Sequence, residues 1–178
     1  MGTQGVGALG GPLAARAIAD AANLLEVAAQ ASRDRWEEAG GAAVQAASLR
    51  RRAEELGGVD AEAHAAAVDA LRRRAELDPQ HRDEEIARAL ADAAAPPLEL
   101  AQLAADVAVL GAEIAQRCDP NLRPDAVAAC LLAEASGRGA AHLLEINLAV
   151  TAEDERLSAA QAGLRAGRTA AERALGGD

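Results

Sequence analysis

The stretch LELAQLAADVAVLGAEIAQ, residues 98–116, decides the fold class of this chain. Its larger apolar residues recur at intervals of three or four positions. This spacing is typical of one face of an amphipathic α-helix, whereas a half-buried strand would alternate at every second residue. The stretch therefore predicts a helix with one buried face, which carries Leu100, Leu103, Val107, Leu110 and Ile114.

The composition extends this prediction to the whole chain. The 178 residues include 51 alanines and 22 leucines, and Trp36 is the only aromatic residue. A core without Phe or Tyr excludes most all-β designs, because strands favour aromatic and β-branched side chains. With 51% hydrophobic and 26% charged residues the chain is too apolar to be disordered, and no apolar run reaches the roughly 18 residues of a membrane span. We predict a soluble all-α protein.

Glycine and proline divide the helical periodicity into about seven segments. A helix over 42–56 is expected to end at Gly57-Gly58, since helices often end on glycine. Asp60 is expected to open the next helix. Pro96-Pro97 is expected to break or kink a later one, because proline removes a backbone donor and clashes with the preceding turn.

We therefore predict one domain over residues 1–178, a compact multi-helix bundle with a proline-kinked helix and a flexible segment at 1–11. The net charge of −10 argues against a nucleic acid or an anionic membrane as partner. Cys118 and Cys130 lack the paired spacing of zinc sites and are expected to be reduced core thiols. No leader segment is recognised, so the expected location is the cytoplasm.

Asp60 and His64 lie four residues apart and so share one helix face. Such a pair is able to move protons near neutral pH, because histidine titrates there and a carboxylate shifts it. The alternative is structural: an aspartate directly after two glycines is a good helix N-cap, and an exposed histidine one turn later needs no further role. Metal binding is not expected, because the three histidines are not grouped and no His-Glu-x-x-His motif is present.

Four further residues are candidates for ligand contacts. Asp125 follows Pro124 at a helix start, where the helix dipole also stabilises a carboxylate without any ligand. Asn147 lies between Ile146 and Leu148, and its amide needs hydrogen-bond partners, either a ligand or a neighbouring backbone. Gly10 and Gly11 precede the first helix, where their amides form either an anion-friendly entrance or the end of a flexible tail.

Taken together, these features resemble the cyclodeaminase/cyclohydrolase family of folate enzymes. Two stretches carry most of the likeness: VDAEAH at 59–64 and PDAVAACLLAEASGRGAAHLLEINL at 124–148. The glycine-rich helix entry at 5–31 and AAAPPLELA at 93–101 follow the same order and spacing. The resemblance implies an all-helical homodimer that binds a reduced folate, with a tetrahydrofolate derivative as substrate and no tightly bound cofactor.

The resemblance also implies roles for single residues. Asp60 matches the second acid of the family's acidic motif and would be the catalytic carboxylate, while the first acid falls on Gly58 and the aromatic on His64. His64 would then assist in place of the missing acid. Gly10, Gly11, Asp125 and Asn147 would contact the substrate, although Pro124 replaces a serine of the family pattern. The activity implied is that of a formimidoyltetrahydrofolate cyclodeaminase or a methenyltetrahydrofolate cyclohydrolase.

Gly58 also supports an alternative function. A relative that has lost one acid of the motif would keep the helical dimer and act as a folate-binding or assembly module without catalysis.

Overall fold

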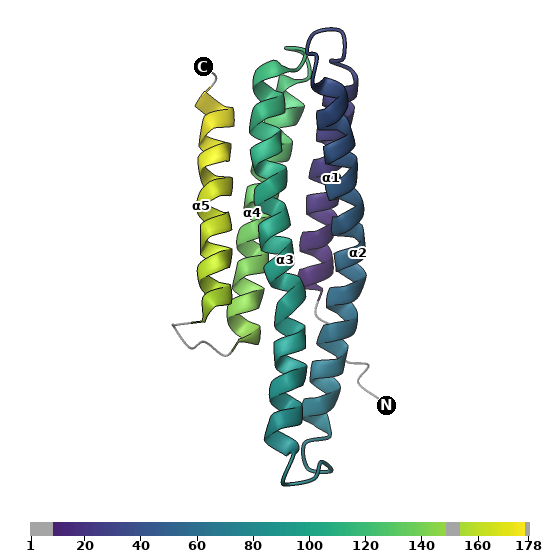
Figure 1. The fold of residues 1–178 in the computed structure, drawn as a ribbon, viewed down its shortest axis with the longest axis vertical. Helices are drawn as coiled ribbons and strands as arrows, with labels where there is room; N and C mark the ends of the chain where they lie inside the picture. Colours follow the sequence, from purple (N-terminus) through teal and green to yellow (C-terminus); the bar gives the residue numbers. More distant parts are fainter. Residues whose placement is uncertain (1–8, 149–153, 177–178) are drawn as a thin grey trace.

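The computed structural model describes residues 9–148 and 154–176, and over these ranges it contains five helices and no strand (Figure 1). This confirms the all-α prediction, with fewer and longer helices than expected. The helices are α1 (Gly10–Gln30), α2 (Ala39–Arg72), α3 (Arg82–Arg117), α4 (Arg123–Asn147) and α5 (Glu155–Gly176). None of them is long and apolar enough to cross a membrane.

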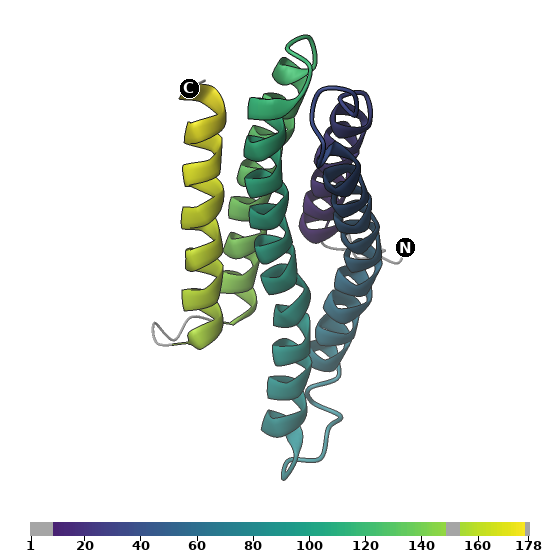
Figure 2. The same ribbon diagram turned by 45° about the horizontal axis from the view of Figure 1, so that its top comes forward.

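The helices run up and down, and α2 and α3 lie in front of α1 and α4 in the view of Figure 1. Helix α5 packs against α3 and α4 and does not reach α1 or α2. Because α2 and α3 have 34 and 36 residues, their connected ends extend past the other helices, as Figure 2 also shows. The segment at 1–11 is not wholly a tail: Gly10 begins α1 and Gly11 is buried, while residues 1–8 lie outside the described ranges.

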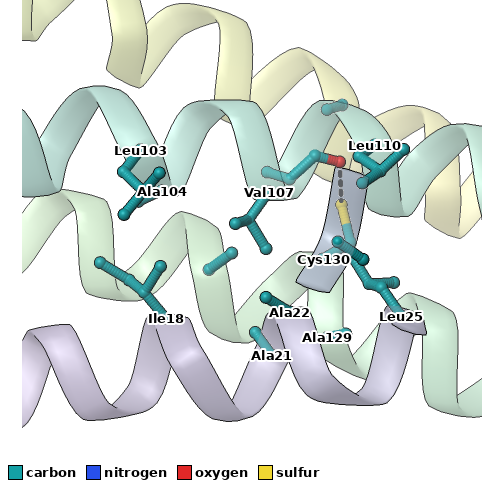
Figure 3. Packing of buried hydrophobic residues seen from close by; sticks show 14 of the residues in the cluster. Ile18, Ala21, Ala22, Leu25, Leu103, Ala104, Val107, Leu110, Ala129 and Cys130 are labelled. Atoms are coloured by element: carbon teal, nitrogen blue, oxygen red, sulfur yellow. Dashed lines mark hydrogen bonds between the residues drawn. The ribbon is translucent and has the colours of Figure 1, made fainter. Parts of the chain in front are cut away.

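The core is built from alanine and a few large aliphatic side chains (Figure 3). Leu25 and Val107 are fully buried between α1, α3 and α4. A Cβ added at Gly111 of α3 would lie 3.2 Å from the Cβ of Cys130, so these two helices approach each other closely. The Cys130 thiol donates to the Ala108 carbonyl at 3.1 Å, and burial raises its pKa to about 11. Both cysteines are free and buried, as predicted.

The predicted helix end at Gly57-Gly58 is wrong, because α2 continues through both glycines. Gly57 is instead a point of close packing: a Cβ there would lie 3.2 Å from the Cβ of Ala15 on α1. The small residue lets the two helices touch, and glycine in place of alanine lowers helix stability by only about 1 kcal/mol. Asp60 is therefore an interior residue of α2 and not its N-cap.

The predicted break at Pro96-Pro97 is also wrong, because α3 runs through both prolines, which are buried. Pro97 has no N–H, so the carbonyl of Ala93, four residues earlier, has no hydrogen-bond donor within the helix. The side chain of Asn147 on α4 replaces it, with Nδ2 donating to the Ala93 oxygen at 2.7 Å. The kink at this point stays a prediction.

The end of the bundle where α1 meets α2 is closed by the sole aromatic residue. Trp36 lies between these helices, is 7% exposed, and has the guanidinium of Arg117 at 5.4 Å from its ring centroid. Ser32 is buried beside it, donates to the Ala28 carbonyl at 2.7 Å and accepts from the Asp119 amide at 2.9 Å. These contacts join the α1–α2 connection to the α3–α4 connection.

Candidate functional site

Asp60 is the one charged side chain that is buried in the described part of the chain, with 6% exposure. Helix α2 presents it to the first turn of α1, where it faces Gly11. A Cβ built on Gly11 would overlap the carboxyl group of Asp60, so no other residue fits at this position without displacing the acid. The first amides of a helix have no intrahelical acceptor and form its positive end. Gly11, in the first turn of α1, thus adjoins a carboxyl group of the same chain.

Burial shifts the protonation of this acid. Desolvation raises the pKa of Asp60 above its usual value, and the nearby positive charge of His64 lowers it in part. His64 is half-buried one turn further along α2, on the same helix face as Asp60. A carboxyl group with a raised pKa is better suited to carry a proton near neutral pH than an exposed one.

The raised pKa has a consequence for stability. Native Asp60 holds its proton at a higher pH than unfolded Asp60, so the protein loses stability as pH rises through the native pKa. We expect Asp60→Asn, which cannot ionise, to be more stable than the wild type at pH 7. The gain should disappear near pH 3, where both states of the wild type are protonated. Urea unfolding of the two proteins across this range measures the difference, and an equal gain at both pH values would exclude ionisation as its cause.

Asn147 has a structural partner, the Ala93 carbonyl, so of the two alternatives left by the sequence the neighbouring backbone is observed. One turn before it, Leu143 lies against Gly10: a Cβ on Gly10 would be 3.2 Å from a methyl carbon of Leu143. Gly10 and Gly11 therefore connect the end of α4 to Asp60. The signal for the Asn147 contact was present in the sequence, because a carbonyl four residues before a helical proline needs a donor.

Asp125 does not join this group. It is exposed in the first turn of α4, whereas Leu143, which touches Gly10, lies 18 residues later on the same helix. At 1.5 Å per residue the two levels are about 27 Å apart. Within one chain the structure brings Gly10, Gly11 and Asp60 together and leaves Asp125 at the other end of α4. The substrate contact of Asp125 stays a prediction.

Among the residues that the structure describes, no group of three or more His, Cys, Asp or Glu side chains could hold a metal ion. A hollow of about 420 Å³ lies between α4 and α5, bordered by Glu134, Arg138 and Arg168. Because α5 does not reach α1 or α2, this hollow is separate from Asp60.

Comparison with known proteins gives two findings. A family model described as formiminotransferase-cyclodeaminase matches residues 2–166. The crystal structure of formiminotetrahydrofolate cyclodeaminase from Thermotoga maritima has a TM-score of 0.79 and 21% sequence identity to this chain, and the match covers 94% of this chain and 87% of that one. At this identity the structural likeness supports the fold alone. No match was found among curated proteins.

Proposed function

Because this chain belongs to the formiminotransferase-cyclodeaminase family, we propose that it acts on a reduced folate as a formimidoyltetrahydrofolate cyclodeaminase, with Asp60 as the group that transfers the proton. The observation that carries the proposal is the buried carboxyl of Asp60, which lies against Gly11 with His64 on the same helix face. The enzyme would be a cytoplasmic homodimer that needs no tightly bound cofactor.

The reaction requires one proton to move between two nitrogens. N10 of the folate attacks the carbon of the protonated formimidoyl group on N5, and the bond from that carbon to the terminal nitrogen breaks. The proton lost by N10 leaves with the terminal nitrogen as ammonia, and the carbon remains as the methenyl bridge between N5 and N10. A carboxylate is able to accept the proton from N10 and then donate it to the leaving nitrogen. Burial favours this exchange, because it raises the pKa of Asp60.

Hydrolysis of the methenyl bridge would use the same groups. A carboxylate would then remove a proton from water as the water adds to the amidinium carbon, after which the ring opens to the formyl product. Both reactions are therefore included in the test.

A folate-binding or assembly module without catalysis is the second candidate. Gly58 favours it, since the family's first acid falls there. In the structure Gly58 is exposed, and a Cβ at this position would meet open space, so no neighbouring group takes the place of the missing carboxylate directly at Gly58.

The proposal is tested by turnover of both folates with the purified wild type and Asp60→Asn. Methenyl absorbance should appear from the formimidoyl substrate with release of ammonia, and the substitution should lower kcat by about 100-fold or more, the usual contribution of a positioned acid-base group. Asp69→Asn is the matched control, because Asp69 is exposed on the same helix and pairs with Arg73 at 2.8 Å. It should keep wild-type turnover.

Each remaining outcome decides between the candidates. Undiminished turnover by Asp60→Asn would remove this residue from the mechanism. A wild type that is stabilised by folate in a thermal shift but turns over neither substrate would favour the binding module. A wild type that shows neither effect would leave only the assembly role.

A further inference from the structure

The inner face of α2 carries Asp60 at a position that alanine occupies elsewhere on the same helix. Ala46, Ala53 and Ala67 precede and follow it at intervals of seven residues, and each of them is at most 4% exposed. Residues at this spacing lie on one face of a helix. Asp60 thus belongs to the row of small side chains that packs α2 into the bundle. Its carboxyl group is larger than the methyl groups of this row and needs space on the facing helix.

Two glycines, one on each helix, provide this space. Gly11 of α1 lies against the carboxyl group of Asp60, where a Cβ would overlap the acid. Three residues before Asp60, a Cβ on Gly57 would be 3.2 Å from the Cβ of Ala15 and 4.0 Å from the Cα of Pro12. Each helix therefore has a glycine where the other helix comes closest, and the two contacts lie within one turn of each other.

The two contacts are coupled through the separation of the helices. Three residues of α2 span about 4.5 Å along the helix axis, so α1 and α2 cannot move apart at Gly57 without also moving apart at Asp60. Carbon atoms in contact are normally about 3.5–4.0 Å apart. A methyl group on Gly57 would thus separate the helices by roughly 0.5 Å, and water would gain access to the carboxyl group of Asp60.

The charges around Asp60 make its burial measurable. Desolvation is the largest cause of its raised pKa, and His64 on its own helix lowers this pKa in part. On α1, Arg16 is exposed and pairs with Asp20 at 3.1 Å. On α3, Asp92 is the charged residue near this level, and it is exposed. Since these charges stay in place, water that enters between α1 and α2 would lower the pKa of Asp60.

We infer that Gly57 is a positioning residue for Asp60: it lets α2 approach α1 closely enough to hold the buried acid against Gly11. Gly57 acts through the separation of the two helices and not by contact with a substrate. The inference rests on the proposed function for its effect on turnover, but not for its effect on the burial and ionisation of the acid.

Gly57→Ala tests this role. The pKa of Asp60 should fall toward its usual value, and carbon NMR of the carboxyl group measures it without any substrate, with Asp60→Asn to identify the signal. With folate substrates, kcat should fall about tenfold, less than the loss for a displacement of 1 Å. KM should change little, because the added methyl group is enclosed between the helices. The variant should fold, since alanine favours a helix more than glycine does and offsets part of the overpacking.

Ala15→Gly provides the rescue. In the double variant Gly57→Ala/Ala15→Gly the methyl group moves from α1 to α2, so the helices are able to keep their separation and the composition of the chain is unchanged. The pKa of Asp60 should return to its wild-type value, and kcat should return to within about twofold of the wild type. A purely local effect of glycine on α2 would not be reversed by a change on α1.

Gly41→Ala is the matched control. Gly41 is an exposed glycine of the same helix, with open space around its Cβ position. The substitution should change neither the pKa of Asp60 nor kcat.

The two readouts separate failure of this inference from failure of the proposed function. An unchanged pKa of Asp60 in Gly57→Ala, or a lowered pKa that Ala15→Gly does not restore, overturns the inference whatever the activity. If the pKa follows the substitutions but kcat of an active wild type does not, the effect on turnover is overturned. A wild type that turns over neither folate, with a pKa that follows the substitutions, supports the positioning of the acid and rejects the proposed function.

Discussion

Gly11→Ala is expected to lower turnover by about 100-fold, the loss that a displacement of about 1 Å causes in a catalytic group. The added methyl group would overlap the carboxyl of Asp60, so either the acid or the first turn of α1 must move. The overpacking should also lower the free energy of unfolding by about 1–3 kcal/mol. Steady-state kinetics and urea unfolding measure the two effects.

Gly41→Ala is the control for the glycine itself. It places the same methyl group on an exposed helical position with open space, where replacing glycine by alanine should stabilise the helix by roughly 0.5–1 kcal/mol. Turnover should not change. If Gly11→Ala were as active and as stable as the wild type, the contact between Gly11 and Asp60 would not hold the acid in place.

Asn147→Ala is expected to destabilise the protein by about 1–3 kcal/mol, because it leaves the Ala93 carbonyl unpaired beside Pro97. The loss should depend on the proline. In a Pro97→Ala background, residue 97 regains its N–H and is able to bond to the Ala93 carbonyl within α3. Asn147→Ala should then cost much less, and urea unfolding of the four proteins of this double-mutant cycle measures the coupling between the two positions.

Pro96→Ala provides the matched control for this cycle. It restores the neighbouring N–H, whose acceptor is the carbonyl of Asp92, and so should leave the effect of Asn147→Ala unchanged. Equal losses in the wild-type and Pro97→Ala backgrounds would show that Asn147 stabilises the bundle by some other contact.

The buried faces of the helices could be predicted from periodicity. Leu100, Leu103, Val107, Leu110 and Ile114 are at most 7% exposed, as the three-to-four spacing indicated. The prediction was correct because burial of an apolar stripe is the main source of helix stability in a folded protein. The residues that a helix buries can therefore be recognised from their spacing in its own sequence.

The helix boundaries could not be predicted in the same way. Glycine serves both as a helix end and as a point of close helix contact, and Gly57 is the second because Ala15 and Pro12 of α1 lie against it. Likewise, Pro97 is accommodated inside α3 because Asn147 of α4, 50 residues later in the chain, donates to the Ala93 carbonyl. In both cases the deciding contact comes from another helix, and the sequence around the glycine or the proline does not identify which residue makes it.

The candidate site was predicted in part. Asp60 and His64 share a helix face because residues four apart in a helix always do. Gly11 lies against Asp60 because α1 packs on α2, and residue spacing within one helix does not predict this contact. Asp125 was grouped with them on the family pattern alone. Asp125 lies at the end of α4 that is far from Asp60, because of the direction in which α4 runs in the bundle. A comparison of motifs along the chain gives no information on this direction.

Trp36 gives this protein a single natural fluorophore, and its location limits what that fluorophore reports. Asp60 lies 21 residues beyond Ala39, the first residue of α2, which corresponds to about 31 Å along the helix from the end where the indole is buried. Emission spectra therefore monitor the tryptophan end of the bundle, and occupancy of a ligand beside Asp60 should leave them nearly unchanged. A reporter placed on the extended α2–α3 ends would be needed to follow the other half of the molecule.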